Sequence, residues 1–256
     1  MLNHERTCIT VKKKITVIQV LLILVVICCG GYTTKYFYDS HKAQTGFEEL
    51  KQEVEAHSPK GDVVSRANNG MLEKYYGLYT RNNDMVGWLN IPGTVVDYPV
   101  VRHTDNDFYL HKNFDKEYQF SGIPFLDYQC YDGTLNSIIY AHNMRDGSMF
   151  AVITKFTDKA FYDAHKSITY DSLYNEEKYE IIAAFTTKVG ADNEFKYYNY
   201  ADMDDKRQFD EYVSTAKLLS FYDTGVTAQY GDKLLTLSTC AHRASNDRFV
   251  IVAKKV

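Results

Sequence analysis

A possible nucleophile and a cationic side chain stand at the ends of two strand-like segments. Cys240 follows the apolar run 234–237, and Arg248 begins a second apolar run, 249–253. A thiol is a nucleophile only as its thiolate, and an ordinary thiol pKa of about 8.5 leaves it mostly protonated at neutral pH. Cys240 therefore needs a base or a cationic neighbour before it can attack a substrate.

The two apolar runs predict a pair of neighbouring strands. Neither run alternates clearly between apolar and polar residues, which indicates strands that are buried on both faces. Residues 241–247 join them and are short enough for a hairpin. An antiparallel pair would bring Cys240, at the end of one strand, close to Arg248, at the start of the next.

Histidine is the usual base for a cysteine nucleophile, and the fold rather than the sequence brings the two together. His142 ends the apolar segment 135–141 and is followed by the turn-like stretch NMRDG. A histidine at one strand end and a cysteine at another fit a preorganised pair. His242, two residues from Cys240, is the local alternative. The other six histidines, His111 among them, are expected to be cytoplasmic, stalk or surface residues.

Three short motifs together resemble the signature of the sortases, which are membrane-anchored cysteine transpeptidases of Gram-positive bacteria. They are TLSTC at 236–240, the arginine that opens the final strand, and YAHN at 140–143, about a hundred residues upstream of the cysteine. The stretches GWLNIPGTVVDYPVV and FYLHKNF match as well. A long helix expected at 204–219 resembles class B members in particular. The resemblance implies a mainly β fold, the sortase-type closed barrel with N-terminal helices and one long inserted helix.

The resemblance also assigns roles to residues. Cys240 is similar to the family nucleophile, His142 to the general acid/base and Arg248 to the third catalytic residue. Four further residues would line the groove for the sorting signal, namely Asn106, Leu110, Tyr140 and Ser238. Some class B members carry an acid directly after the cysteine, whereas this chain has Ala241, and Asp247 is the only acid in the loop.

The activity that the resemblance implies is acyl transfer through a thioester. The thiolate would attack after the Thr of an Asn-Pro-x-Thr-like or Ser/Pro-Pro-x-Thr-like sorting motif. An amine of a peptidoglycan precursor or of a pilin would then release the acyl group, so the expected partners are surface proteins with sorting signals and this amine. We expect no cofactor and no metal, because the sequence has no HExxH or paired CxxC, and DMDD at 202–205 lacks the Gly and distal Glu of a calcium loop.

Two other functions fit part of the pattern. A cell-wall cysteine hydrolase would use the same thiol with water as acceptor, although papain-like enzymes place the cysteine before the histidine. A non-catalytic surface β-module would keep Cys240 buried and inert. A Cys130–Cys240 disulfide is a further possible state of the thiol.

The N-terminus predicts a membrane anchor. Residues 15–34 carry no charge, and about 20 apolar residues of helix cross a bilayer. Residues 1–14 hold four Lys/Arg and one acid, which favours a cytoplasmic N-terminus and an extracellular C-terminal part. A cleaved signal peptide is the alternative, but no clear small-x-small cleavage site follows. Residues 15–256 have 25 basic and 32 acidic residues and no basic block, so nucleic-acid binding is not expected.

The remaining chain is expected to fall into two parts, a stalk with N-terminal helices at 35–84 and a catalytic barrel at 85–256. With 22 Tyr and 14 Phe the composition favours strands. Most of the candidate strands are bounded by turn residues. They are 86–91, 94–101, 122–127, 135–141, 167–172, 177–189, 233–239 and 248–254.

Overall fold

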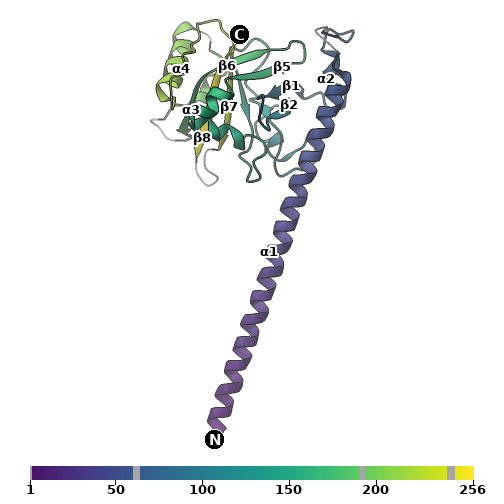
Figure 1. Cartoon of the computed structure of the whole chain (residues 1–256), viewed down its shortest axis with the longest axis vertical. Coiled ribbons are helices and arrows are strands. Elements are labelled where there is room, and N and C mark those ends of the chain that lie inside the picture. The colour runs from purple at the N-terminus through teal and green to yellow at the C-terminus, as the bar shows by residue number, and fades with distance from the viewer. Residues whose placement is uncertain (1, 60–63, 191–193, 204, 241–245) are drawn as a thin grey trace. The chain divides into compact units, whose positions relative to one another are not determined.

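The computed structural model describes residues 2–59, 64–190, 194–203, 205–240 and 246–256, with side chains from residue 19 onward except that of Cys240. These residues form the helices and strands shown in Figure 1. The α-helices are α1 (Leu2–His57), α2 (Glu73–Arg81), α3 (Lys159–Ala164) and α4 (Lys206–Leu219). The strands are β1 (Met85–Asn90), β2 (Asp97–Val101), β3 (Phe125–Leu126), β4 (Asn136–Tyr140), β5 (Ser167–Ser172), β6 (Lys178–Lys188), β7 (Leu234–Cys240) and β8 (Asp247–Lys255). Short 3-10 helices are η1 (Phe108–His111), η2 (Ala151–Thr157) and η3 (Tyr197–Asn199).

The chain divides into two compact units, Met1–Gln44 and Thr45–Val256. In the described residues one helical stretch, Gln19–His57, is long and apolar enough to cross a membrane. Its most apolar 18-residue window has a mean hydropathy of 1.8, and no part of that window is buried in the protein. The expected anchor and the polar segment after it belong to one continuous helix, α1, rather than to separate elements.

The second unit is a closed barrel with the strand order β1-β2-β3-β4-β7-β8-β6-β5, and β5 pairs back with β1. Most neighbours are antiparallel, but β2–β3 and β4–β7 run parallel. All eight expected strands are present, with β3 shortened to two residues. The closed barrel confirms the predicted fold class. Closure leaves no strand edge of the sheet unpaired.

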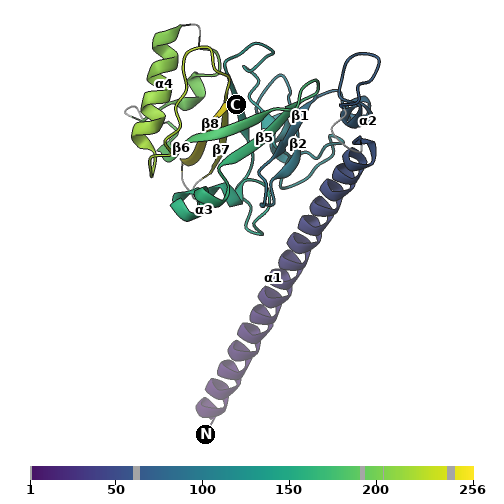
Figure 2. The same ribbon diagram turned by 45° about the horizontal axis from the view of Figure 1, so that its top comes forward.

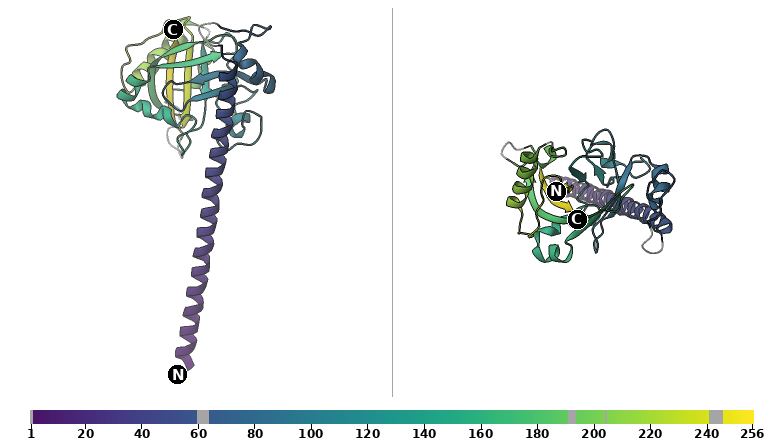
Figure 3. Two further views of the ribbon diagram at one scale, coloured as in Figure 1. Left: turned by 45° about the vertical axis from the view of Figure 1, so that its right-hand side comes forward. Right: turned by 90° about the horizontal axis from the view of Figure 1, so that it is seen from above.

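The C-terminal hairpin forms the most buried part of the barrel wall. Residues 234–239 of β7 and 249–253 of β8 are buried, in agreement with the prediction that the runs 234–237 and 249–253 are buried on both faces. The two strands pair antiparallel from Leu234↔Lys254 to Cys240↔Arg248, and they lie side by side as the yellow strands of Figure 3. Burial of apolar surface stabilises the folded state by about 25 cal/mol per Å². The buried hairpin therefore gives Cys240 and Arg248, at its end, a rigid support.

Helix α4 covers the outside of the barrel beside β6, as Figure 2 shows. Asp205 caps its first turn by accepting a hydrogen bond from the Gln208 N–H at 2.8 Å. Its buried face carries Phe209, Tyr212, Val213 and Ala216. The inserted helix expected at 204–219 is therefore confirmed as α4, whereas α3 and η2 were not expected from the sequence.

Candidate active site

The parallel pairing of β4 with β7 brings His142 and Cys240 to the same end of the barrel. Tyr140 is the register partner of Ser238. The pairing continues past β4, since the Ala141 N–H donates to the Ser238 carbonyl at 3.3 Å and Thr239 Oγ1 donates to the Ala141 carbonyl at 2.7 Å. His142 and Cys240 each stand two residues beyond a paired residue, so their backbones meet at one rim.

The antiparallel pairing of β7 with β8 brings the third residue to this rim. Cys240 and Arg248 are direct register partners, which confirms that the thiol-bearing and guanidinium-bearing residues are neighbours. The same rim of β6 supplies Thr187, which lies opposite Arg248. The side chain of Cys240 and the whole of His242 lie outside the described part of the chain.

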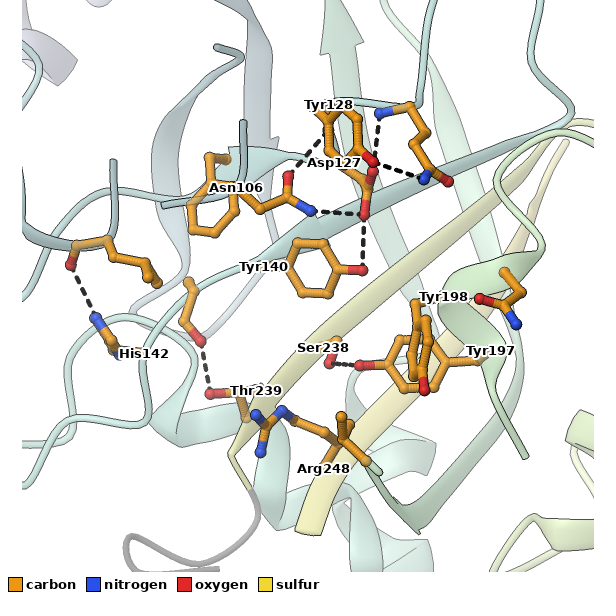
Figure 4. Close-up of a pocket in the computed structure, with 16 residues that line it drawn as sticks. Asn106, Asp127, Tyr128, Tyr140, His142, Tyr197, Tyr198, Ser238, Thr239 and Arg248 are labelled. Atoms are coloured by element: carbon orange, nitrogen blue, oxygen red, sulfur yellow. Dashed lines mark hydrogen bonds between the residues drawn. The ribbon is translucent and has the colours of Figure 1, made fainter. Parts of the chain in front are cut away.

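A pocket of about 500 Å³ opens at this rim (Figure 4). His142 and Arg248 line it together with all four residues that were expected in the sorting-signal groove. Its remaining wall residues were not expected from the sequence. They are Phe125, Asp127, Tyr128, Gln129, Ala141, Val189, Tyr197, Tyr198, Asn199 and Thr239.

His142 is held in one orientation by a backbone group. Its Nε2 lies 2.9 Å from the carbonyl oxygen of Leu110. A carbonyl oxygen can only accept, so Nε2 carries the proton and Nδ1 of the neutral ring has the free lone pair. The ring also stacks on that of His111, with centroids 5.4 Å apart and planes 18° apart. Nδ1 is therefore the nitrogen that can exchange a proton with a substrate or thiol.

The environment of His142 keeps the imidazole neutral. Burial lowers its pKa from the ordinary value of 6.5, the bond to Leu110 partly opposes that shift, and nearby His111 lowers it further. A neutral imidazole at pH 7 can accept a proton from a thiol. His111, expected to be a plain surface residue, is thus a direct neighbour of the candidate base.

The Leu110 carbonyl is placed by η1 and by a close backbone approach. Gly122 has φ +58°, and a Cβ built on it would lie 2.4 Å from the Leu110 oxygen. Only glycine fits a left-handed position with another backbone so near. Gly122 therefore supports the acceptor that orients His142.

Arg248 lies half-buried at the pocket wall. Its Nη1 donates to the Asp247 carbonyl at 3.3 Å, close to the edge of hydrogen-bond range. A guanidinium carries five N–H donors, and within the described residues this weak bond uses one of them, so Arg248 can serve an oxygen in the pocket.

A buried carboxylate, Asp127, joins two of the expected groove residues. It is 3% exposed, and its Oδ2 accepts from Asn106 Nδ2 at 3.0 Å and from the Tyr140 hydroxyl at 2.9 Å. The Ser238 hydroxyl likewise forms a hydrogen bond with the Tyr197 hydroxyl at 2.6 Å. The only sequence sign of Asp127 was a carboxylate directly after the apolar segment 122–126, which is a weak signal for a site.

Cys130 is a free thiol and is fully buried. Its sulfur donates to the Asn136 carbonyl at 3.3 Å, and burial raises its pKa to about 12. A thiol with that pKa is almost entirely protonated at neutral pH. The disulfide alternative for Cys130 is therefore not the state of this structure.

Comparison with known proteins agrees with the geometry. Residues 89–256 match the sortase domain family. Sortase B of Listeria monocytogenes is 35% identical over 79% of this chain and 80% of its own length, and sortase B of Staphylococcus aureus is 28% identical over 95% and 97%. The solved sortase B of Clostridium perfringens superposes with a TM-score of 0.64 at 32% identity, covering 70% of this chain and 98% of its own. The chain therefore belongs to the sortase family, and it is a class B cysteine transpeptidase.

Proposed function

We propose that Cys240, His142 and Arg248 carry out the acyl transfer at this rim and that the adjoining pocket binds the sorting signal. The observation that carries the proposal is the register of three neighbouring strands. β4 and β7 run parallel with Tyr140 opposite Ser238, and β7 runs antiparallel to β8 with Cys240 opposite Arg248. Strands fixed in this way hold functional groups more rigidly than loops do.

The first half-reaction transfers the acyl group to sulfur. His142 takes the thiol proton at Nδ1, and the resulting thiolate adds to the Thr carbonyl carbon of the motif. The tetrahedral intermediate collapses to a thioester, the Thr–X bond breaks, and imidazolium His142 gives its proton to the departing amine. The lowered pKa of His142 supports this cycle, because the ring begins neutral and can give up the proton it gains.

Arg248 serves the oxygen of that intermediate. Negative charge moves onto the carbonyl oxygen during attack, and donors already aimed at that position stabilise it most. Arg248 is always charged and lies half-buried in the pocket wall, where water screens it less than at the surface.

The second half-reaction transfers the acyl group to an amine. A wall-precursor or pilin amine attacks the thioester carbonyl carbon and His142 accepts the amine proton. The C–S bond then breaks, the new amide leaves, and the Cys240 thiolate regains the proton from His142. The proposed substrate is a surface protein with an Asn-Pro-x-Thr-like or Ser/Pro-Pro-x-Thr-like motif. Support for this class comes from the S. aureus sortase B structure described as a substrate complex, which is 26% identical, covers 86% of this chain and 98% of its own, and has a TM-score of 0.75.

The proposed location is the outer face of the cell membrane, with one N-terminal anchor. Residues 1–14 would be the cytoplasmic tail, 15–34 the anchor, 35–84 the stalk with N-terminal helices and 85–256 the catalytic barrel. The apolar and unburied window within Gln19–His57 of α1 supports the anchor.

A panel of fluorogenic sorting peptides tests the function. The wild-type chain should cleave at least one after Thr, and should form more amide product than acid when an oligoglycine or diamino acceptor is added. Cys240→Ala and His142→Ala should each abolish cleavage, while His242→Ala should retain most of it. Cleavage that survives Cys240→Ala would refute the proposal, and a product that stays entirely hydrolytic would favour the cell-wall hydrolase.

A further inference from the structure

Asp127 occupies the centre of a hydrogen-bond cluster in the pocket wall. Among the described residues, the three groups that form hydrogen bonds with its carboxylate are all donors. Asn106 Nδ2 and the Tyr140 hydroxyl share Oδ2, and the Gln129 N–H lies 2.9 Å from Oδ1. The main chain of Asp127 is itself fixed, since its N–H donates to the Ile138 carbonyl at 2.8 Å. A carboxylate at this place has no rotamer freedom to follow a ligand.

The cluster decides which way the Tyr140 hydroxyl points. A tyrosine has one hydroxyl proton, and here it is donated to Asp127. Burial raises the pKa of Tyr140, with Tyr197 and Asp127 adding to that shift, so the hydroxyl keeps its proton. What Tyr140 presents to the pocket is therefore an oxygen lone pair, which accepts a hydrogen bond.

The cluster also decides the orientation of the Asn106 amide. Its Oδ1 accepts from the Tyr128 N–H at 3.0 Å, which excludes the flipped amide at this position. Its NH₂ group therefore faces Asp127, and one of the two amide hydrogens is used there. The second hydrogen is left as a donor at the pocket wall.

We propose that Asp127 is a positioning residue that sets the hydrogen-bond polarity of the pocket, making Tyr140 an acceptor and Asn106 a donor toward one backbone amide of the bound sorting peptide. This inference rests on the proposed function, because it assumes that a peptide occupies the pocket. A peptide amide has one N–H, which can donate to the Tyr140 oxygen, and one C=O, which can accept from the Asn106 NH₂ group. If Tyr140 becomes a donor or Asn106 an acceptor, a polar group of the buried peptide amide loses its hydrogen-bond partner, and the affinity for the peptide falls.

Asp127→Asn reverses the polarity with almost no change in volume. The new side chain has one acceptor oxygen and one NH₂ group, yet three donors still surround it. When the NH₂ group faces Tyr140, it donates to the tyrosine oxygen, and the tyrosine proton turns toward the pocket. We expect KM for a cleaved sorting peptide to rise about threefold to tenfold with kcat changed less than about twofold, the usual size for one hydrogen bond.

Asp202→Asn is the matched control. Asp202 accepts a hydrogen bond from the Tyr131 hydroxyl at 2.6 Å, so it forms the same kind of pair at an exposed position that does not line the pocket. Its kinetic constants should equal those of the wild type. Tyr140→Phe removes the acceptor itself and should raise KM as Asp127→Asn does.

Ester-substituted peptides distinguish polarity from general damage to the pocket. Each peptide replaces one amide N–H of the motif, other than the scissile one, by oxygen. In the full-length wild-type chain one position should show a KM penalty of about threefold to tenfold, and this penalty should disappear in both Asp127→Asn and Tyr140→Phe. A penalty that persists in both variants, or an Asp127→Asn enzyme with wild-type KM, would overturn the inference.

Two further results keep the test decisive. Should Asp127→Asn fail to fold, the ester series on Tyr140→Phe decides alone, because the acceptor is absent there. Cleavage that depends on Cys240 while no ester position is penalised refutes only the role of Asp127. Cleavage that does not depend on Cys240 refutes the proposed function, and this inference with it.

Discussion

His142 combines burial, a backbone acceptor and a second histidine around one titratable ring. Its lowered pKa links protonation to folding. The unfolded chain binds the proton near pH 6.5 and the folded chain only at lower pH, so the free energy of unfolding falls as pH drops through that window. Above pH 6.5 the ring is neutral in both states, and the protein keeps the full stability that it loses when His142 is protonated.

The linkage predicts a difference between the wild type and His142→Gln. Thermal unfolding followed by circular dichroism should show that the wild type loses more stability than the variant as pH falls from 7.5 to 5. Parallel losses in the wild type and His142→Gln would contradict the assigned direction of the pKa shift.

Arg248→Lys should lower kcat/KM on a sorting peptide by about 10²–10³, the usual loss for one oxyanion donor. Lysine keeps the charge but presents a point donor instead of a planar fork. Thermal unfolding should be nearly unchanged, and Arg207→Lys, at an exposed position of α4, should behave as wild type. Near-normal kcat/KM in Arg248→Lys would make the residue structural and leave the oxyanion to backbone N–H groups.

The two thiols of the barrel unit should react very differently. Iodoacetamide at pH 8 followed by peptide mass mapping should modify Cys240 and leave Cys130 untouched until the protein is unfolded, because Cys130 is buried with a pKa near 12. Recovery of a Cys130–Cys240 cross-link from active enzyme would refute this assignment. An unreactive Cys240 in the folded chain would favour a non-catalytic module.

At the scale of elements, the 3-10 helix η1 positions the base through the Leu110 carbonyl and the stacked ring of His111, and the loop before β3 supports that carbonyl. The Leu110 carbonyl accepts a hydrogen bond from His142 Nε2–H, and the Gly122 backbone lies close to that carbonyl oxygen. Neither segment contributes a reacting group. Their packing nevertheless decides where Nδ1 of His142 points.

Gly122→Ala should therefore reduce activity through His142. The new Cβ would lie 2.4 Å from the Leu110 oxygen, and φ +58° adds the strain of a left-handed residue, about 1–2 kcal/mol. We expect kcat to fall at least about tenfold, since misplacing a catalytic group by about 1 Å can cost 10²-fold.

Gly225→Ala separates the two causes. Gly225 has φ +73°, but nothing lies within 4 Å of a Cβ built there. This variant should lose some thermal stability and keep its kcat. Equal kcat losses in both glycine variants would mean that backbone strain alone, rather than contact with the Leu110 carbonyl, explains the effect.

For the whole molecule, the start of α1 predicts a single-pass topology. Four basic residues precede an uncharged segment, and the described part of that segment is exposed along its length. Protease added to intact protoplasts should remove the barrel unit, and a tag at the N-terminus should stay protected. A protected barrel, or a soluble form cleaved after residue 34, would contradict the topology.

The sequence alone determined the features that depend on neighbouring residues. The apolar runs 234–237 and 249–253 predict two strands, and the short connection 241–247 makes them a hairpin, so the meeting of Cys240 with Arg248 follows from neighbouring residues. The apolar segment 15–34 and the amphipathic helix expected at 204–219 were visible because they too depend only on neighbouring residues. The choice of His142 over His242 stays a prediction, although β4 brings His142 to the right rim.

The tertiary structure decided the features that depend on distant segments. The parallel register of β4 with β7 joins residues about a hundred positions apart, and no periodicity encodes such a register. The Leu110–His142 bond, the approach of Gly122 and the Asp127 cluster arise because barrel closure packs separate loops at one rim. Residue patterns report which face of an element is buried, whereas hydrogen-bond partners across loops are set only once the whole barrel has closed.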